Sequence, residues 1–143
     1  MIPIVHRTLV MQLEAGGTGR FSVLAHMTYE ADDPFAVTVV FSHDGRVLAR
    51  WRLDRQMMAD GMERPVGEGD VRMGPQATGL WRELRMEFLG EPHTDGGRHH
   101  AVILAWAPAV MSFLDETYEV VPSGQEKVSV DDFLAELIAG AEG

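Results

Sequence analysis

Two clusters of polar residues in this sequence have side chains or spacing that could carry chemistry. His93, His99 and His100 lie near Asp95 and could bind a metal, but their spacing matches no established zinc-ligand motif. The glycine-rich run 66–70 (VGEGD) could cradle a phosphate, yet it is not followed by Lys-Ser or Lys-Thr and precedes a predicted strand instead of a helix. We therefore expect solvated loop histidines and a turn that uses the conformational freedom of glycine.

The residues needed for nucleophilic or acid–base catalysis are absent or in the wrong context. The chain has no cysteine, which excludes thiolate nucleophiles, thiolate metal ligands and disulfides. None of its serines stands in a GxSxG turn. Adjacent carboxylates such as Asp32 and Asp33 fall in turns or on predicted helix surfaces, where solvated charge is the common role. The sequence predicts no enzyme, no catalytic residue, no bound metal and no cofactor.

Arginines and methionines form a different kind of candidate, a surface that binds another molecule. The segment 46–55 holds four arginines, the only such concentration in the chain. Methionine is flexible and polarisable, so the methionines at 57, 58 and 62 fit either a core, which is the commoner role, or an adaptable contact surface. The candidate partner-binding residues are Arg50, Arg52, Arg55, Met57, Met58, Met62, Arg64 and Arg72.

The overall charge limits the classes of partner. A formal net charge of −10 repels phosphate polyanions and anionic lipid headgroups, so it disfavours nucleic acid and membrane surfaces as partners. The sequence has no secretory signal pattern and no apolar run of about 18 residues, so we expect a cytoplasmic protein without direct membrane insertion. An exposed tryptophan among the arginines could stack a base, which keeps a single-stranded nucleic-acid-binding module as the alternative function.

The elements that must position these residues are mostly strands. Asp44-Gly45 lies between two alternating apolar runs and predicts a tight hairpin. After Leu53 the period becomes helical, which predicts a short helix capped by Asp54 and closed by Gly61 in the left-handed conformation. We expect most of the tryptophans, which all fall in strands, to be buried. About seven strands are predicted, at 8–13, 21–29, 36–41, 47–53, 71–73, 80–89 and 99–106.

The last third of the chain has helical periodicity. One helix is predicted from Pro108 through Tyr118, and a capping box at Ser129 and Asp132 predicts a second one that stops at Gly140. No internal repeat and no long linker divides the sequence. We therefore expect a single domain over residues 1–143, of α+β class, in which a mainly antiparallel sheet packs against a short helix and two C-terminal helices.

Five motifs follow one another in the sequence, namely YEADDPFAVTVVF, RWRLDRQMMADGM, RPVGEGDVRMGP, APAVMSFL and VVPSGQE. In order and spacing the chain resembles, from about Thr8 to Ile138, the SsgA-like family of sporulation and cell division proteins. The resemblance implies a curved, barrel-like sheet similar to the whirly single-stranded nucleic-acid-binding fold, assembled as a homotrimer. It also implies a role without catalysis at the division septum of filamentous actinomycetes, with FtsZ or another SsgA-like protein as the partner.

Two positions depart from the family pattern. The family has an aromatic-rich strand that continues into an Ala-Arg-Asp-Leu-Leu-like helix, whereas this chain has WRLDRQMM at 51–58. A family tryptophan is replaced by Gly74. Both changes alter large side chains at a predicted contact region. The resemblance therefore implies a divergent paralogue whose partner can differ from that of the central FtsZ recruiter.

Overall fold

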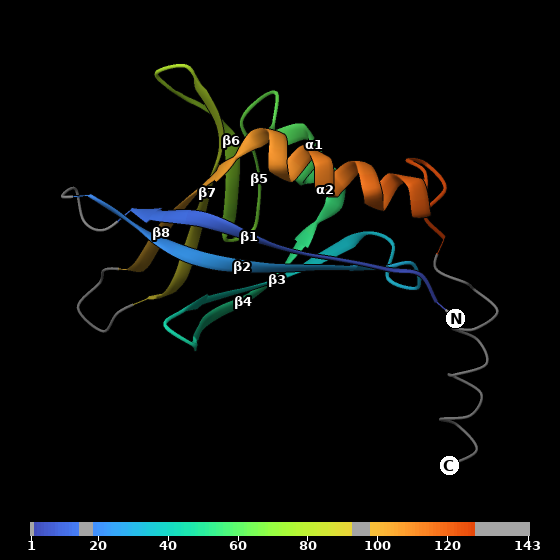
Figure 1. Cartoon of the computed structure of the whole chain (residues 1–143), viewed down its shortest axis with the longest axis horizontal. Helices are drawn as coiled ribbons and strands as arrows, with labels where there is room; N and C mark the ends of the chain where they lie inside the picture. The colour runs from blue at the N-terminus through green and yellow to red at the C-terminus, as the bar shows by residue number, and fades with distance from the viewer. Residues whose placement is uncertain (1, 15–18, 93–97, 128–143) are drawn as a thin grey trace, which may run out of the picture.

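A computed structural model of the chain describes residues 2–14, 19–92 and 98–127 (Figure 1). Eight strands in these ranges form one sheet in the order β4-β3-β2-β1-β8-β7-β6-β5, and every neighbouring pair is antiparallel. The elements are β1 (Ile4–Glu14), β2 (Arg20–Glu30), β3 (Ala36–His43), β4 (Arg46–Asp54), α1 (Arg55–Gly61), β5 (Val66–Glu68), β6 (Val71–Thr78), β7 (Trp81–Pro92), β8 (Arg98–Trp106) and α2 (Ala107–Val120).

The sheet is strongly curled, and its concave side holds the core. In Figure 1, β5–β7 run at a steep angle to β1–β4, and α2 lies along the top of the sheet. Successive side chains of a strand point to opposite faces, so one side of each long strand is buried, for example Val23, Ala25 and Met27 of β2. Aromatic rings join the two halves, because Phe88 lies 5.6 Å from Phe41 between ring centroids. The curled sheet therefore closes over a single apolar cluster.

The structure confirms the α+β class and the curved antiparallel sheet. Each of the seven predicted strands is present, and most are longer than predicted. The eighth strand, β5, falls where a glycine-rich loop was predicted, since three residues are too few to show an alternating pattern. The helix predicted after Pro108 is α2. The second terminal helix, predicted between Ser129 and Gly140, lies outside the described residues, and the likeness to the whirly fold stays a prediction.

Two turns carry the backbone conformations that their sequences indicated. Asp44 and Gly45 have φ of 50° and 76°, as a two-residue hairpin turn between β3 and β4 requires. Gly69 has φ of 58° at the turn between β5 and β6. The glycine-rich run is therefore a hairpin turn, as expected, and no phosphate-binding helix follows it.

Helix α1 begins as predicted but ends differently. The Asp54 carboxylate accepts a hydrogen bond of 2.8 Å from the Met57 backbone N–H, which caps the helix. The left-handed closing conformation predicted for Gly61 is wrong, because Gly61 is the last helical residue and the next residue, Met62, is also right-handed. Gly61 is required for space instead, since a Cβ there would lie 2.9 Å from Met73 Cβ on β6.

Candidate functional site

The structure divides the predicted partner-binding residues into a buried set and an exposed set. Burial removes Arg55 and the methionines from the residues that a partner can contact on the folded surface, and it confirms that these methionines pack in the core. The physical reason is that the inner face of α1 packs against β6 and α2. The buried residues are Arg55, Met57, Met58 and Met62, and the exposed ones are Arg50, Arg52, Arg64 and Arg72.

Arg55 is 1% exposed and ties α1 to the end of α2. Its Nη1 atom donates to the backbone oxygens of Thr117 at 3.1 Å and Val121 at 2.8 Å. Its Nη2 atom donates to the Glu126 carboxylate at 2.6 Å. The guanidinium thus binds carbonyl groups at the C-terminal end of α2, where the Thr117 oxygen also accepts from the Val121 backbone N–H at 2.9 Å. Arg55 therefore holds α1 and the end of α2 together inside the fold.

Two tyrosine rings enclose the same guanidinium. The Cζ atom of Arg55 lies 4.8 Å from the ring centre of Tyr29 and 4.2 Å from that of Tyr118. Burial raises the pKa of both tyrosines above 10.0, an effect that the Arg55 charge partly offsets. Hydrogen bonding to its own backbone N–H, and then to Arg55, lowers the pKa of Glu126 below 4.5. The cluster is therefore most stable when Glu126 is ionised and both tyrosines are neutral.

The sequence does indicate that Arg55 is buried. The indication is its spacing from the methionines of α1, and it is lost when the arginines of the segment are only counted. Arg55, Met58 and Met62 stand at helical spacings of three and four, so Arg55 lies on the apolar stripe of α1. An arginine on such a stripe must find several acceptors inside the fold. Its acceptors come from residues 62 to 71 positions later in the chain, and no local pattern indicates them.

The four exposed arginines do not form one continuous stripe. Arg50 and Arg52 lie on β4 at one end of the sheet order, whereas Arg72 lies on β6 near the other end. Arg52 pairs with Asp33 at 2.6 Å, and Arg64 pairs with Asp60 at 3.2 Å. Within the ranges that the structure describes, Arg50 and Arg72 have no ion-pair partner. The structure thus offers two separate places where an unpaired guanidinium faces solvent.

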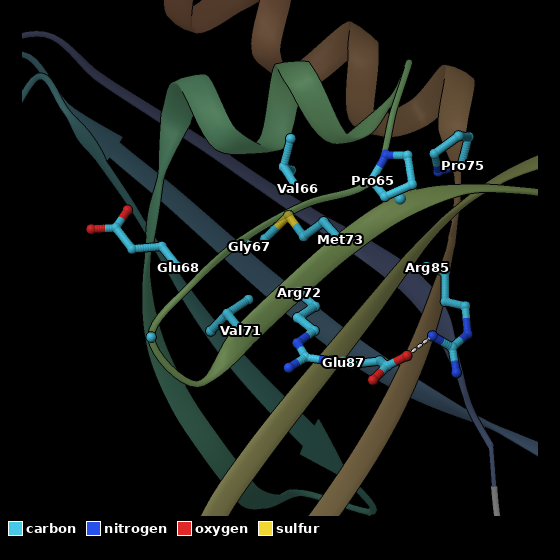
Figure 2. Close-up of a pocket in the computed structure, with 12 residues that line it drawn as sticks. Pro65, Val66, Gly67, Glu68, Val71, Arg72, Met73, Pro75, Arg85 and Glu87 are labelled. Atoms are coloured by element: carbon cyan, nitrogen blue, oxygen red, sulfur yellow. Dashed lines mark hydrogen bonds and ion pairs between the residues drawn. The ribbon is translucent and has the colours of Figure 1, made fainter.

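One of these places is a hollow of about 640 Å³ over β5, β6 and β7 (Figure 2). Figure 2 shows Pro65 beside the end of α1, Pro75 beyond it, and Arg72, Arg85 and Glu87 farther down the strands. Arg85 and Glu87 form an ion pair two residues apart on β7. The hollow is lined by Pro65, Val66, Gly67, Glu68, Gly69, Val71, Arg72, Met73, Gly74, Pro75, Arg85 and Glu87.

Glycines shape the floor of this hollow. A Cβ at Gly67 would lie 3.2 Å from both the Cγ of Arg72 and the backbone oxygen of Val71. A Cβ at Gly74 would lie 3.4 Å from the Cα of Pro65. The small residues allow the chain segments to approach closely, and they leave the backbone and one guanidinium accessible. Because Gly74 has no side chain, it also leaves the hollow open.

The lining of the hollow is suited to binding. It offers an unpaired guanidinium at Arg72, which can hold a carboxylate through two parallel hydrogen bonds, beside proline and glycine surface. In the part of the chain that the structure describes, no three His, Asp or Glu side chains gather as metal ligands. His93 and Asp95 of the predicted histidine cluster lie outside that part, while His100 lies 3.4 Å from the Glu87 carboxylate.

Two of the three tryptophans are exposed, so the prediction that most are buried is wrong. Trp81 is 62% exposed and Trp106 is 52% exposed, and their ring centroids lie 6.4 Å apart. Both rings belong to residues at strand ends. Trp106 is paired with Glu83, and Glu83 is two residues from Trp81 on β7, so all three side chains lie on the same, convex side of the sheet. Only Trp51 faces the core, where its ring centroid lies 4.8 Å from that of Phe88.

No helix within the described ranges has the length and apolar character needed to cross a bilayer.

Comparison with known proteins connects this geometry to one family. The profile of the Streptomyces sporulation and cell division protein SsgA matches residues 23–126. The chain is 33% identical over 134 residues to the sporulation-specific cell division protein SsgB of Frankia casuarinae, covering 92% of this chain and 90% of that protein. It is 30% identical over 137 residues to SsgB of Streptomyces coelicolor, with 94% and 93% covered.

Solved structures agree with the sequence matches. The SsgA-like sporulation-specific cell division protein of Thermobifida fusca superposes with a TM-score of 0.81 at 28% identity, over 97% of this chain and 96% of that chain. SsgB of Streptomyces coelicolor, in which mutations correlate with longitudinal cell division during sporulation, superposes with a TM-score of 0.76 at 29% identity, over 88% and 94%. The chain therefore belongs to the SsgA-like family of sporulation and cell division proteins.

Proposed function

We propose that this protein is a non-enzymatic regulator of sporulation-specific cell division that binds FtsZ or another SsgA-like protein. Relatives that carry the name of sporulation-specific cell division proteins over nine-tenths of their length support the division role. The partners follow from the family resemblance. A cytoplasmic location at the septum and a homotrimeric assembly belong to the same proposal.

The observation that carries the proposal is the hollow over β5–β7. Its floor is rigid, because β6 pairs with β7 along its whole length while Val71 and Met73 are anchored in the core. Its surface is formed by backbone, prolines, Glu68, the Arg85–Glu87 ion pair and the exposed Arg72. A surface that is already ordered loses little conformational entropy when a partner docks. This favours recognition of a protein segment that brings a carboxylate to Arg72.

The absence of a side chain at Gly74 keeps the hollow open. A Cβ at this position would lie 3.4 Å from the Cα of Pro65, so a tryptophan would take up space beside Pro65 in the hollow that both residues line. The open hollow therefore supports a partner preference that differs from that of relatives with tryptophan here. This agrees with the interpretation of the chain as a divergent paralogue.

Binding of single-stranded nucleic acid is the alternative, and the geometry gives it less support. Base recognition of this kind combines cationic side chains with aromatic platforms on one surface. Trp51, which follows Arg50 and precedes Arg52 in the sequence, faces the core. The exposed pair, Trp81 and Trp106, lies on β7 and β8, with β1, β2 and β3 between these strands and β4.

Sedimentation velocity tests the proposal with purified components. The protein is titrated with FtsZ and, separately, with an SsgA-like protein of the same organism. We expect a complex with at least one of them, weakened at least tenfold by Arg72→Glu and by Gly74→Trp. Arg82→Glu changes charge equally at an exposed site outside the hollow and is the matched control. Binding to neither protein would contradict the proposal, and equal weakening by Arg82→Glu would show that the hollow is not the contact.

A further inference from the structure

The sheet has an open edge along β4. This strand is the last in the sheet order, so within the described residues no strand pairs with its second side. In Figure 1 it forms the lower margin of the sheet, in teal, beside β3. An edge strand presents unpaired backbone N–H and C=O groups, which are a template for another strand.

The hydrogen-bond pattern shows which groups face the open side. The Arg55 backbone N–H donates to the Phe35 oxygen at 2.8 Å, which places this pair in register with the β3–β4 ladder. Antiparallel ladders alternate, so every second residue back along β4, including Trp51, directs its backbone groups to β3. The backbone donors and acceptors of Arg50 and Arg52 therefore point away from β3, toward the open edge.

The edge is held in an extended conformation before any partner arrives. Trp51 anchors it from the inside through its ring contact with Phe88, and Leu53 is fully buried. At the end of the strand, Asp54 caps α1. A strand ordered in this way can pair with an added segment without first losing its own conformational freedom.

The charge on this edge is positive although the molecule is strongly acidic. Arg46, Arg50 and Arg52 are all exposed on β4 in a chain of net charge −10. Arg52 is already paired with Asp33, but Arg46 and Arg50 have no ion-pair partner among the residues that the structure describes. Between them, Val47 and Leu48 are 53% and 51% exposed. The edge thus combines free guanidinium groups with apolar surface.

The far end of the edge leads into a second hollow, of about 300 Å³, between β4 and the β5–β6 turn. Leu53, Met57 and Val71 form its apolar wall. Arg52, Asp54 and Glu68 also line it, and because Arg52 is already paired with Asp33, the two carboxylates would repel a third one placed inside. An apolar side chain is therefore the better occupant at this end, whereas acidic side chains suit the part beside the arginines.

We propose that the open edge of β4 binds an extended, acidic segment of a partner protein by strand addition. Carboxylates of the segment lie beside Arg50 and Arg52 on the convex side, and its alternate side chains are apolar. A second copy of this chain is disfavoured as the occupant, because antiparallel pairing of β4 with itself brings guanidinium groups opposite or next to one another. The inference rests on the proposed role as a protein-binding domain but uses a surface separate from the hollow over β5–β7.

The first test uses a defined probe, a fluorescein-labelled heptapeptide in which glutamate alternates with valine. Its matched control replaces each glutamate with lysine. Fluorescence anisotropy at low ionic strength should show binding of the acidic peptide and none of the basic one. The double variant Arg50→Glu/Arg52→Gln should lower the affinity at least tenfold, whereas Arg72→Glu and Arg82→Glu should leave it within twofold. Unchanged thermal melting of the double variant shows that it folds.

The second test measures the hydrogen exchange of backbone amides on β4. On addition of the acidic peptide, the amide hydrogens of Arg50 and Arg52 should exchange with solvent at least tenfold more slowly, as measured by NMR. Equal binding of both peptides, equal weakening by Arg72→Glu, or no protection at these two amides would overturn the inference. Failure of wild-type protein to bind the peptide, with FtsZ or SsgA-like binding intact, overturns the strand addition alone and leaves the proposed function standing.

Discussion

At the scale of single residues, the environment of Arg55 has the clearest consequence for stability. Its guanidinium is buried, hydrogen-bonded to Glu126 and two carbonyl groups, and enclosed by two tyrosine rings. Arg55→Met would leave these acceptors without their donor, and we expect the free energy of unfolding to fall by about 3 kcal/mol. Urea denaturation measures this value. Arg72→Met, at an exposed position, should change it by about 0.5 kcal/mol or less; similar losses in the two variants would refute the structural role of Arg55.

Part of this stability depends on pH through the ionisation of Glu126. Its pKa is lowered in the folded state, so the unfolded chain binds a proton more readily near pH 4.5. The contribution of Glu126 is therefore present above its unfolded pKa and is lost as the pH falls through its lowered folded pKa. Melting curves between pH 7 and pH 3 should show Glu126→Gln less stable than wild type at pH 7 and converging with it at low pH. A constant difference across this range would rule out the linkage.

The tyrosines give the opposite dependence in alkali. Burial raises the pKa of Tyr118, so the folded state retains the phenol proton after the unfolded chain has lost it. Stability from this group is complete below about pH 10 and declines as the pH rises through the raised folded pKa. Tyr118→Phe should flatten the decline of melting temperature between pH 9 and pH 11. An unchanged slope in this variant would show that the phenol of Tyr118 is not the group responsible.

At the scale of elements, the packing of α1 on β6 depends on Gly61. A methyl group there would lie 2.9 Å from Met73 Cβ and 3.3 Å from a Leu84 methyl carbon, both in the buried core. Overpacking of this kind costs about 1–3 kcal/mol, whereas the helix propensity of alanine over glycine returns about 1 kcal/mol. We therefore expect Gly61→Ala to destabilise the protein. Gln56→Ala, on the exposed face of the same helix, is the control, and a urea midpoint of Gly61→Ala at or above wild type would contradict the contact.

At the scale of the whole molecule, the exposed apolar surface beside the β6–β7 turn raises the question of assembly. Leu80 and Trp81 at this turn are 101% and 62% exposed, and β5 lies at the end of the sheet order opposite β4. Such surfaces are commonly covered in cyclic oligomers. We expect sedimentation equilibrium to give three times the chain mass of 15.8 kDa. A single species of 15.8 kDa at the concentrations used for binding would refute the trimer.

The candidate site was predictable in part. The run 64–72 was identified from the sequence because its glycines, proline and arginines stand close together in the chain. Arg85 and Glu87 were missed, since they reach the hollow only through the pairing of β6 with β7. Arg55 was assigned to the surface for the same reason. Its acceptors at Thr117, Val121 and Glu126 come from the other end of the chain.

The strand and helix periods could be predicted from the sequence, as could the Asp44-Gly45 turn, the Asp54 cap and the family, because each depends on neighbouring residues or on ordered motifs. Which strands lie at the edges could not be predicted, since this depends on the pairing of β1 with β8, which are far apart in the chain and join the two halves into one sheet. The tertiary structure also determines which arginines are buried. Periodicity sets the direction in which a side chain points, whereas burial depends on the distant segment that packs against it.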